Sequence, residues 1–236
     1  MKRELFCSAV LVMALASGGA YAGNPAMLAD NVRYLSMGDS FAAGKGAIPA
    51  TQGYAYRLYS NGVFGPMNNT TFDNMALGGT DSSDVLNYQV PQVVKFLPHV
   101  ITMTVGGNDL GRILKGEPPN VVLAEFAANM TAILCNLRAI MAAKDIDVLI
   151  LVGNQPDYPW LSASNPAVRQ VVILANQIIA DAAQACGARV ADVFSAFEGK
   201  ESVYLNYRQG ASPNEPHPTN EGYRVMEKAF EEAAMD

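Results

Sequence analysis

The stretch VITMTVGGND, residues 100–109, joins a continuous apolar and β-branched run to a turn of glycines and polar residues. Such a run predicts a strand that is buried on both faces of a sheet. Similar short runs occur at residues 34–37, 72–76, 148–152 and 190–193. Apolar residues at helical spacing lie between or after them, within residues 123–140, 168–179 and 220–234. Strands that alternate with helices predict one α/β domain whose parallel sheet is covered on both faces.

The turns that follow these strands carry the polar residues of greatest interest. In an open parallel sheet, ligands bind beyond the carboxyl ends of the strands. The turns are Gly38-Asp39-Ser40, Gly78-Gly79-Thr80, Gly106-Gly107-Asn108-Asp109 and the loop 153–166, which holds the single tryptophan, Trp160. We therefore expect these turns to build the functional site.

Only two histidines are present, one just before a predicted strand and one just before the last predicted helix. His99 precedes the strand at residues 100–105, so a rise of about 3.3 Å per residue places it about 23 Å from the turn that follows. His217 lies in a proline-flanked polar segment just before the last predicted helix. A serine hydroxyl needs a base to become a nucleophile, and His217 is the imidazole available to Ser40. On spacing alone, a loop histidine without function is an equal alternative for His217.

Four short blocks of the chain resemble one enzyme family. The blocks are residues 38–41 (Gly-Asp-Ser-Phe), Asn74 with Gly79, residues 106–109 (Gly-Gly-Asn-Asp) and His217 with Pro218. The first resembles the Gly-Asp-Ser-Leu block of the SGNH hydrolases, also called GDSL-type hydrolases, with Phe41 in place of leucine. All four follow the order of that family and span residues 34–222, so the sequence resembles an SGNH hydrolase.

This resemblance implies a fold and a reaction. The fold is a flavodoxin-like three-layer α/β/α domain with a central five-stranded parallel sheet in the order 2-1-3-4-5. The reaction is hydrolysis of carboxylic esters through an acyl-enzyme intermediate, without a cofactor or a metal. Ser40 would attack the carbonyl carbon and His217 would accept its proton. The backbone N–H groups of Ser40 and Gly79 and the side-chain amide of Asn108 would form the oxyanion hole, where charge develops in the transition state.

The last block departs from the family pattern at the residue expected to orient the histidine. The family usually has aspartate three residues before the histidine, and this chain has Asn214. An asparagine carbonyl can accept the histidine N–H, but it supplies no charge to the imidazolium. Glu215 or a backbone carbonyl are the alternatives, the latter in a Ser-His dyad. We expect Asp39 and Asp109, which lie beside catalytic residues, to brace their turns.

The departure at Asn214 leaves two functions open. The first is a secreted esterase or lipase-like hydrolase, and the second is a weakly active or inactive member that binds an acylated or glycan ligand. Family members act on lipids, short esters, thioesters and acetylated sugars, and the sequence does not choose among them. Tyr158 and Trp160, in the loop after the fourth strand, are the candidate substrate contacts.

Composition and the N-terminus bear on partners and location. With 16 Lys and Arg against 22 Asp and Glu, the net charge is −6, and no basic cluster predicts a nucleic-acid partner.

Residues 1–22 resemble a signal peptide, with Lys2-Arg3, an apolar stretch and small residues ending at Ala22. We expect cleavage near Ala22, a single domain at residues 23–236 and a secreted or periplasmic monomer without integral membrane association. We expect no later segment to be long and apolar enough to span a bilayer.

Two cysteines, Cys135 and Cys186, follow the predicted signal peptide. Their helices lie side by side in the expected fold, so a disulfide is conceivable. If both helices end level, however, the cysteines are offset by about 10 Å along the helix axes. A disulfide tolerates at most about 7 Å between Cα atoms. We therefore expect two free, buried thiols.

Overall fold

The computed structural model describes residues 31–206 and 216–236. The predicted signal peptide and Asn214, together with Glu215, lie outside the described residues. Expectations about these positions therefore remain predictions.

Five parallel strands form the central sheet in the order β2-β1-β3-β4-β5, as expected. The strands are β1 (Val32–Gly38), β2 (Thr70–Asn74), β3 (Val100–Thr104), β4 (Leu149–Gly153) and β5 (Arg189–Ala191). In register, Gly38 pairs with Thr104, Thr104 with Gly153, and Gly153 with Ala191. The carboxyl ends of these four strands are therefore level, and the turns after them share one edge of the sheet.

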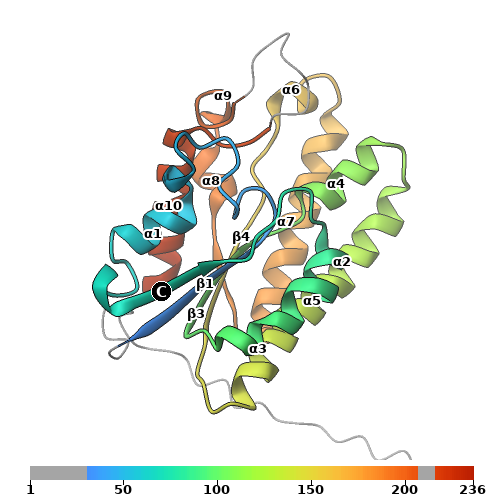
Figure 1. Ribbon diagram of the computed structural model, residues 1–236. Coiled ribbons are helices and arrows are strands. Elements are labelled where there is room, and N and C mark those ends of the chain that lie inside the picture. The colour runs from blue at the N-terminus through green and yellow to red at the C-terminus, as the bar shows by residue number, and fades with distance from the viewer. Residues whose placement is uncertain (1–30, 207–215) are drawn as a thin grey trace, which may run out of the picture.

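Helices cover both faces of the sheet (Figure 1). Helices α1 (Tyr54–Ser60) and α10 (Asn220–Met235) lie on one face, and α5 (Pro119–Ala142) and α7 (Pro166–Cys186) lie on the other. Side chains cap the first turns of α10 and α7, because the Thr219 hydroxyl accepts the Gly222 N–H and the Asn165 side chain accepts the Ala167 N–H. The three-layer α/β/α architecture is thus confirmed.

Shorter helices fill the connections. They are α2 (Ser82–Asp84), α3 (Val93–Phe96), α4 (Gly107–Leu114), α6 (Pro159–Ser162), α8 (Val193–Phe197) and α9 (Glu201–Tyr204). Single turns of 3-10 helix occur at Ala50–Gln52, Met67–Asn69 and Val90–Gln92, and a π-helical turn at Val85–Gln89. Val193 was expected at the end of the fifth strand, but it begins α8, because the Asp192 side chain accepts the Ser195 N–H and caps a helix there.

Helix α5 corrects the expectation that no later segment could span a membrane. An 18-residue window within this 24-residue helix has a mean hydropathy of 1.3, enough by length and composition alone. In the fold, α5 buries Phe126, Met130, Ile133 and Leu137, and a disulfide joins it to α7. One third of the apolar window is buried, so packing within the protein accounts for one face of α5.

The two cysteines form a disulfide, so the expectation of free thiols was wrong. Their Cα atoms are 4.9 Å apart. The error lay in the assumption that α5 and α7 end level. Strand β5 begins opposite Leu151, two residues beyond the start of β4 at Leu149, so α7 ends earlier along the sheet than α5 does, at Cys186. Arg138 of α5, one turn beyond Cys135, donates a hydrogen bond to the Gly187 carbonyl. The end of α7 therefore lies beside Arg138, about one turn before α5 ends at Ala142.

Candidate active site

The Ser40 turn begins where β1 comes too close to β3 for any side chain. Gly38 has φ of +113°, and a Cβ at this position would lie 2.0 Å from the Thr104 carbonyl oxygen. The buried Gln89 side chain holds the same residue, because Oε1 accepts the Gly38 N–H at 2.7 Å and Nε2 donates to its carbonyl at 2.9 Å. Glycine is therefore required here, and it lets the chain turn so that Ser40 lines a cavity.

Asp39 braces this turn, as expected. Its carboxylate accepts the Phe41 N–H at 3.0 Å and the Thr104 hydroxyl at 2.7 Å, which ties the turn to the end of β3. Burial raises the pKa of Asp39 to about 6, against the opposing effect of these hydrogen bonds. Asp39 is therefore a buried carboxyl group beside the nucleophile, with a pKa above that of an exposed aspartate.

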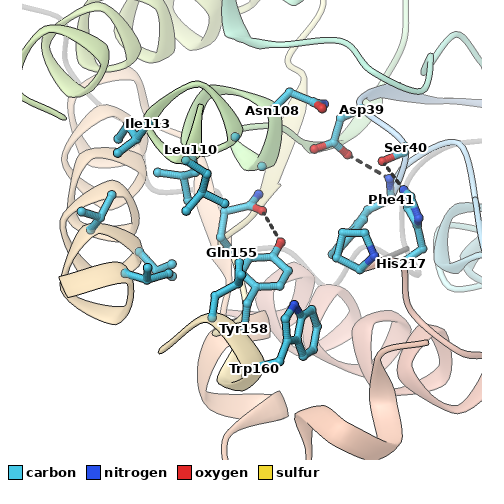
Figure 2. Close-up of a pocket in the computed structure, with 18 of the residues that line it drawn as sticks. Asp39, Ser40, Phe41, Asn108, Leu110, Ile113, Gln155, Tyr158, Trp160 and His217 are labelled. Atoms are coloured by element: carbon cyan, nitrogen blue, oxygen red, sulfur yellow. Dashed lines mark hydrogen bonds between the residues drawn. The ribbon is translucent and has the colours of Figure 1, made fainter. Parts of the chain in front are cut away.

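His217 returns to the Ser40 turn from the far end of the chain. Its Nε2 lies 2.9 Å from Ser40 Oγ, so the predicted pair is within hydrogen-bond reach (Figure 2). The histidine is 6% exposed, and its carbonyl accepts the Asn206 N–H at 2.8 Å. The Phe41 ring meets the imidazole edge-on at 6.0 Å between centroids. Backbone and aromatic contacts thus hold the imidazole over Ser40.

His99 lies at the opposite edge of the sheet, as its place in the sequence predicts. Its N–H donates to the Arg33 carbonyl near the start of β1, and its Nδ1 accepts the Arg33 N–H at 3.2 Å. Partial burial and the nearby Arg33 charge lower the pKa of His99. This histidine therefore bridges strand entries and takes no part in the site.

The three expected oxyanion-hole donors surround the same cavity. A Cβ at Gly78 would lie 3.7 Å from Ser40 Cβ, so the Gly79 turn is directly beside the nucleophile. Within residues 31–206 and 216–236, no hydrogen bond uses the N–H of Ser40 or of Gly79. Asn108 Nδ2 donates to the Thr80 carbonyl at 2.8 Å, which fixes the amide and leaves its second hydrogen for a ligand.

The cavity beside Ser40 has a volume of about 540 Å³. Tyr158 and Trp160, the predicted substrate contacts, line it, and their rings meet edge-on at 5.6 Å (Figure 2). The volume lies within the range of small-molecule sites. Across the part of the chain that the structure describes, no group of His, Cys, Asp and Glu is placed to hold a metal ion.

Sequence reasoning missed several residues that support the site. Gln89 holds Gly38, Thr104 binds Asp39, Ser82 binds Asp109, and Gln155 lies in the cavity wall. Each contact joins segments far apart in the sequence. Only Ser82 had a local signal, since Asp81 and Asp84 around it form a capping box.

Comparison with known proteins points to one family. The model of the GDSL-like Lipase/Acylhydrolase family matches residues 36–225. No curated protein matches this chain in sequence. Among solved structures, a phospholipase A1 from Streptomyces albidoflavus NA297 is similar, with 20% identity, a TM-score of 0.68, and 87% of this chain and 100% of that chain covered.

Two further solved structures share the fold. A lipase from a goat rumen metagenome is 22% identical, with a TM-score of 0.65 over 86% of this chain and 97% of that chain. A variant of an acetyl-xylooligosaccharide esterase from Geobacillus stearothermophilus is 18% identical, with a TM-score of 0.64 over 87% and 94%. At these identities the similarity establishes the fold.

Proposed function

Because the chain belongs to the GDSL-like lipase/acylhydrolase family, we propose that it is a serine carboxylester hydrolase with Ser40 as its nucleophile. The observation that carries the proposal is the 2.9 Å approach of His217 Nε2 to Ser40 Oγ at the edge of the cavity. The lipases and the esterase that share the fold support the class of substrate, an acyl ester.

The reaction follows from the placement of these groups. Ser40 Oγ attacks the ester carbonyl carbon while its proton passes to His217 Nε2. The carbonyl oxygen takes the negative charge and accepts hydrogen bonds from the N–H groups of Ser40 and Gly79 and from Asn108 Nδ2. The ester C–O bond then breaks, and His217 gives the proton to the leaving alcohol. Water attacks the acyl-enzyme with His217 again as the base, which releases the acid and restores Ser40.

We also propose that the protein acts outside the cytoplasm, after cleavage near Ala22. The sequence of residues 1–22 supports export. The Cys135–Cys186 disulfide supports the same location, because disulfides persist in oxidising compartments. A shift in mass of the exported protein, matching loss of residues 1–22, would test the cleavage.

Hydrolysis of nitrophenyl esters by the purified protein tests the function. Ser40→Ala should lower kcat at least about a thousandfold, and His217→Ala should have a similar effect, because the two residues act as one unit. Ser60→Ala, at the exposed end of α1, is a matched control that should retain full activity. Reaction with an alkyl fluorophosphonate should add the phosphonyl group to Ser40, as mass analysis of the peptides would reveal.

The second candidate, an inactive member that binds without turnover, predicts different results. Its basis is Asn214, which replaces the usual aspartate. In that case no ester would be hydrolysed faster by the protein than by Ser40→Ala, and the fluorophosphonate would leave Ser40 unmodified. Either result would exclude the proposed hydrolase.

A further inference from the structure

Helix α4 leads from the oxyanion hole along the wall of the cavity. Asn108 lies in its first turn, and Gly107, Gly111 and Leu114 follow one stripe of the helix at spacings of four and three residues. All four residues line the cavity. At about 1.5 Å per residue, the stripe extends about 10 Å from Gly107 to Leu114. A group bound with its carbonyl oxygen at Asn108 can therefore continue along α4.

Gly111 keeps this path open. A Cβ at Gly111 would meet nothing within 4 Å, and its backbone is ordinary α-helix. Glycine is a poor helix former, so neither the backbone nor packing calls for it here. Gly106 is the opposite case, because a Cβ there would lie 2.9 Å from the Phe126 ring. Because Gly111 lines the cavity, the absence of a side chain there leaves more room in it.

The opposite wall is apolar. It is formed by α6 and the first turns of α7, with Trp160, Leu161, Val168 and Val171 among its residues. Figure 2 shows the cavity residues extending from Ser40 and His217 past Gln155 and Tyr158 to Leu110 and Ile113 of α4. Away from the catalytic end, a ligand therefore meets mainly carbon.

The buried polar side chains in this part of the wall, Gln155 and Tyr158, are hydrogen-bonded within the protein, and Asn165 is exposed. Gln155 Nε2 donates to the Val105 carbonyl at 3.0 Å, and the Tyr158 hydroxyl donates to Gln155 Oε1 at 3.5 Å. The Asn165 carbonyl oxygen accepts the Ala167 N–H at 3.2 Å. A sugar would need several hydrogen-bonding groups aimed at it, whereas an alkyl chain needs none. The wall favours the alkyl chain.

We propose that the groove between α4 and α7 binds the acyl chain of a medium-chain fatty ester, and that Gly111 determines how much chain the groove admits. The inference rests on the proposed function, since it places the ester carbonyl at Ser40. It also commits to the acyl side of the ester. The chain would lie along α4 and leave the groove near Leu114, which is 55% exposed.

A series of nitrophenyl esters, from acetate through butyrate and octanoate to dodecanoate, tests the groove. We expect kcat/KM to rise with chain length up to octanoate, by about fourfold for each methylene that enters the groove. Gly111→Phe should fill the groove and lower the octanoate-to-acetate ratio of kcat/KM at least tenfold. Gly111→Ala should lower the ratio less, in proportion to its smaller side chain.

Ala128→Phe is the matched control, because it adds the same aromatic ring at an exposed position of α5 outside the cavity. The ratio should stay at the wild-type value in this variant. A wild-type protein that prefers acetate, or a ratio that Gly111→Phe leaves unchanged, would overturn the proposal. Should Gly111→Phe fail to fold, Gly111→Ala and Gly111→Leu give the same comparison with smaller side chains.

Binding separates this inference from the proposed catalysis. In the Ser40→Ala protein, calorimetry should detect octanoate binding, and adding Gly111→Phe should weaken it at least tenfold. If esters are not hydrolysed but octanoate binds in this Gly111-dependent way, the groove stands and the proposed catalysis fails. If esters of every length are hydrolysed equally and octanoate does not bind, the catalysis stands and the groove fails.

Discussion

The Asp109 carboxylate accepts two hydrogen bonds from Ser82, one from its N–H at 3.0 Å and one from its hydroxyl at 2.5 Å. Both residues are buried, and Asn129 of α5 donates to the same hydroxyl at 3.0 Å. Asp109 directly follows Asn108, and Ser82 begins α2 three residues after Gly79. The contact therefore joins the two turns that supply the proposed oxyanion donors, and it fixes their separation.

Asp109→Asn should therefore impair catalysis without removing any group that touches the substrate. An asparagine amide cannot accept both Ser82 bonds as the carboxylate does, and an imperfectly paired buried group costs about 1–3 kcal/mol of stability. We expect kcat to fall at least about tenfold while KM changes little, because charge develops only in the transition state. Asp181→Asn, at an exposed position of α7, is the control. An unchanged kcat in the folded variant would mean that the contact serves stability alone.

Asp39 should make stability depend on pH in the direction opposite to that of an ordinary aspartate. Its folded pKa, about 6, exceeds the ordinary aspartate value of 3.8, so the folded state favours the protonated form. The protonated Asp39 therefore adds to the free energy of unfolding. This stabilisation is fully present below pH 3.8 and is lost as the pH rises through about 6, a change of about 3 kcal/mol. The Asp39→Asn side chain stays neutral at every pH, so this variant should not show the loss of stability as the pH rises.

Urea denaturation of both proteins across this pH range measures the effect. The free energy of unfolding of Asp39→Asn minus that of the wild type should rise with pH and level off above about 7. Taking the difference cancels the titration of groups that both proteins share. A difference that stays flat would show that Asp39 ionises equally in the folded and unfolded states.

Asn214 offers a test of how the histidine is oriented. If His217 lacks a charged partner, Asn214→Asp should raise ester turnover by about tenfold or more, since an orienting carboxylate stabilises the imidazolium. Steady-state kcat for a nitrophenyl ester measures this, with Asn214→Ala as the comparison. Equal turnover in both variants and the wild type would place the orienting group elsewhere, with Glu215 or a backbone carbonyl next in line.

The sequence predicted those parts of the molecule that depend on local pattern or on family motifs. Apolar runs predicted the strands, and the match of His217 and Pro218 to the last family block pointed to His217 as the partner of Ser40, from which its Nε2 lies 2.9 Å. Contacts set by three-dimensional packing were not predictable in this way. Gln89 reaches Gly38 across 51 residues, and no periodicity encodes the match between one amide and one peptide group. The register of α7 against α5 depends on where β5 begins. Strand β5 has only three residues, and so short an apolar run could not define its first residue.

The disulfide gives that register a measurable consequence. Cys135 and Cys186 are 51 residues apart, and closing a loop of this length in the unfolded chain corresponds to about 4 kcal/mol of stability in the chain-entropy model. The double variant Cys135→Ala with Cys186→Ala should therefore lower the free energy of unfolding in urea by roughly 2–4 kcal/mol. Single variants serve as controls for lost packing, since each removes the crosslink and one sulfur. Thiol titration of the unfolded, unreduced protein, after removal of the signal peptide, should find no reactive group. Two reactive thiols would mean that no disulfide joins α5 to α7.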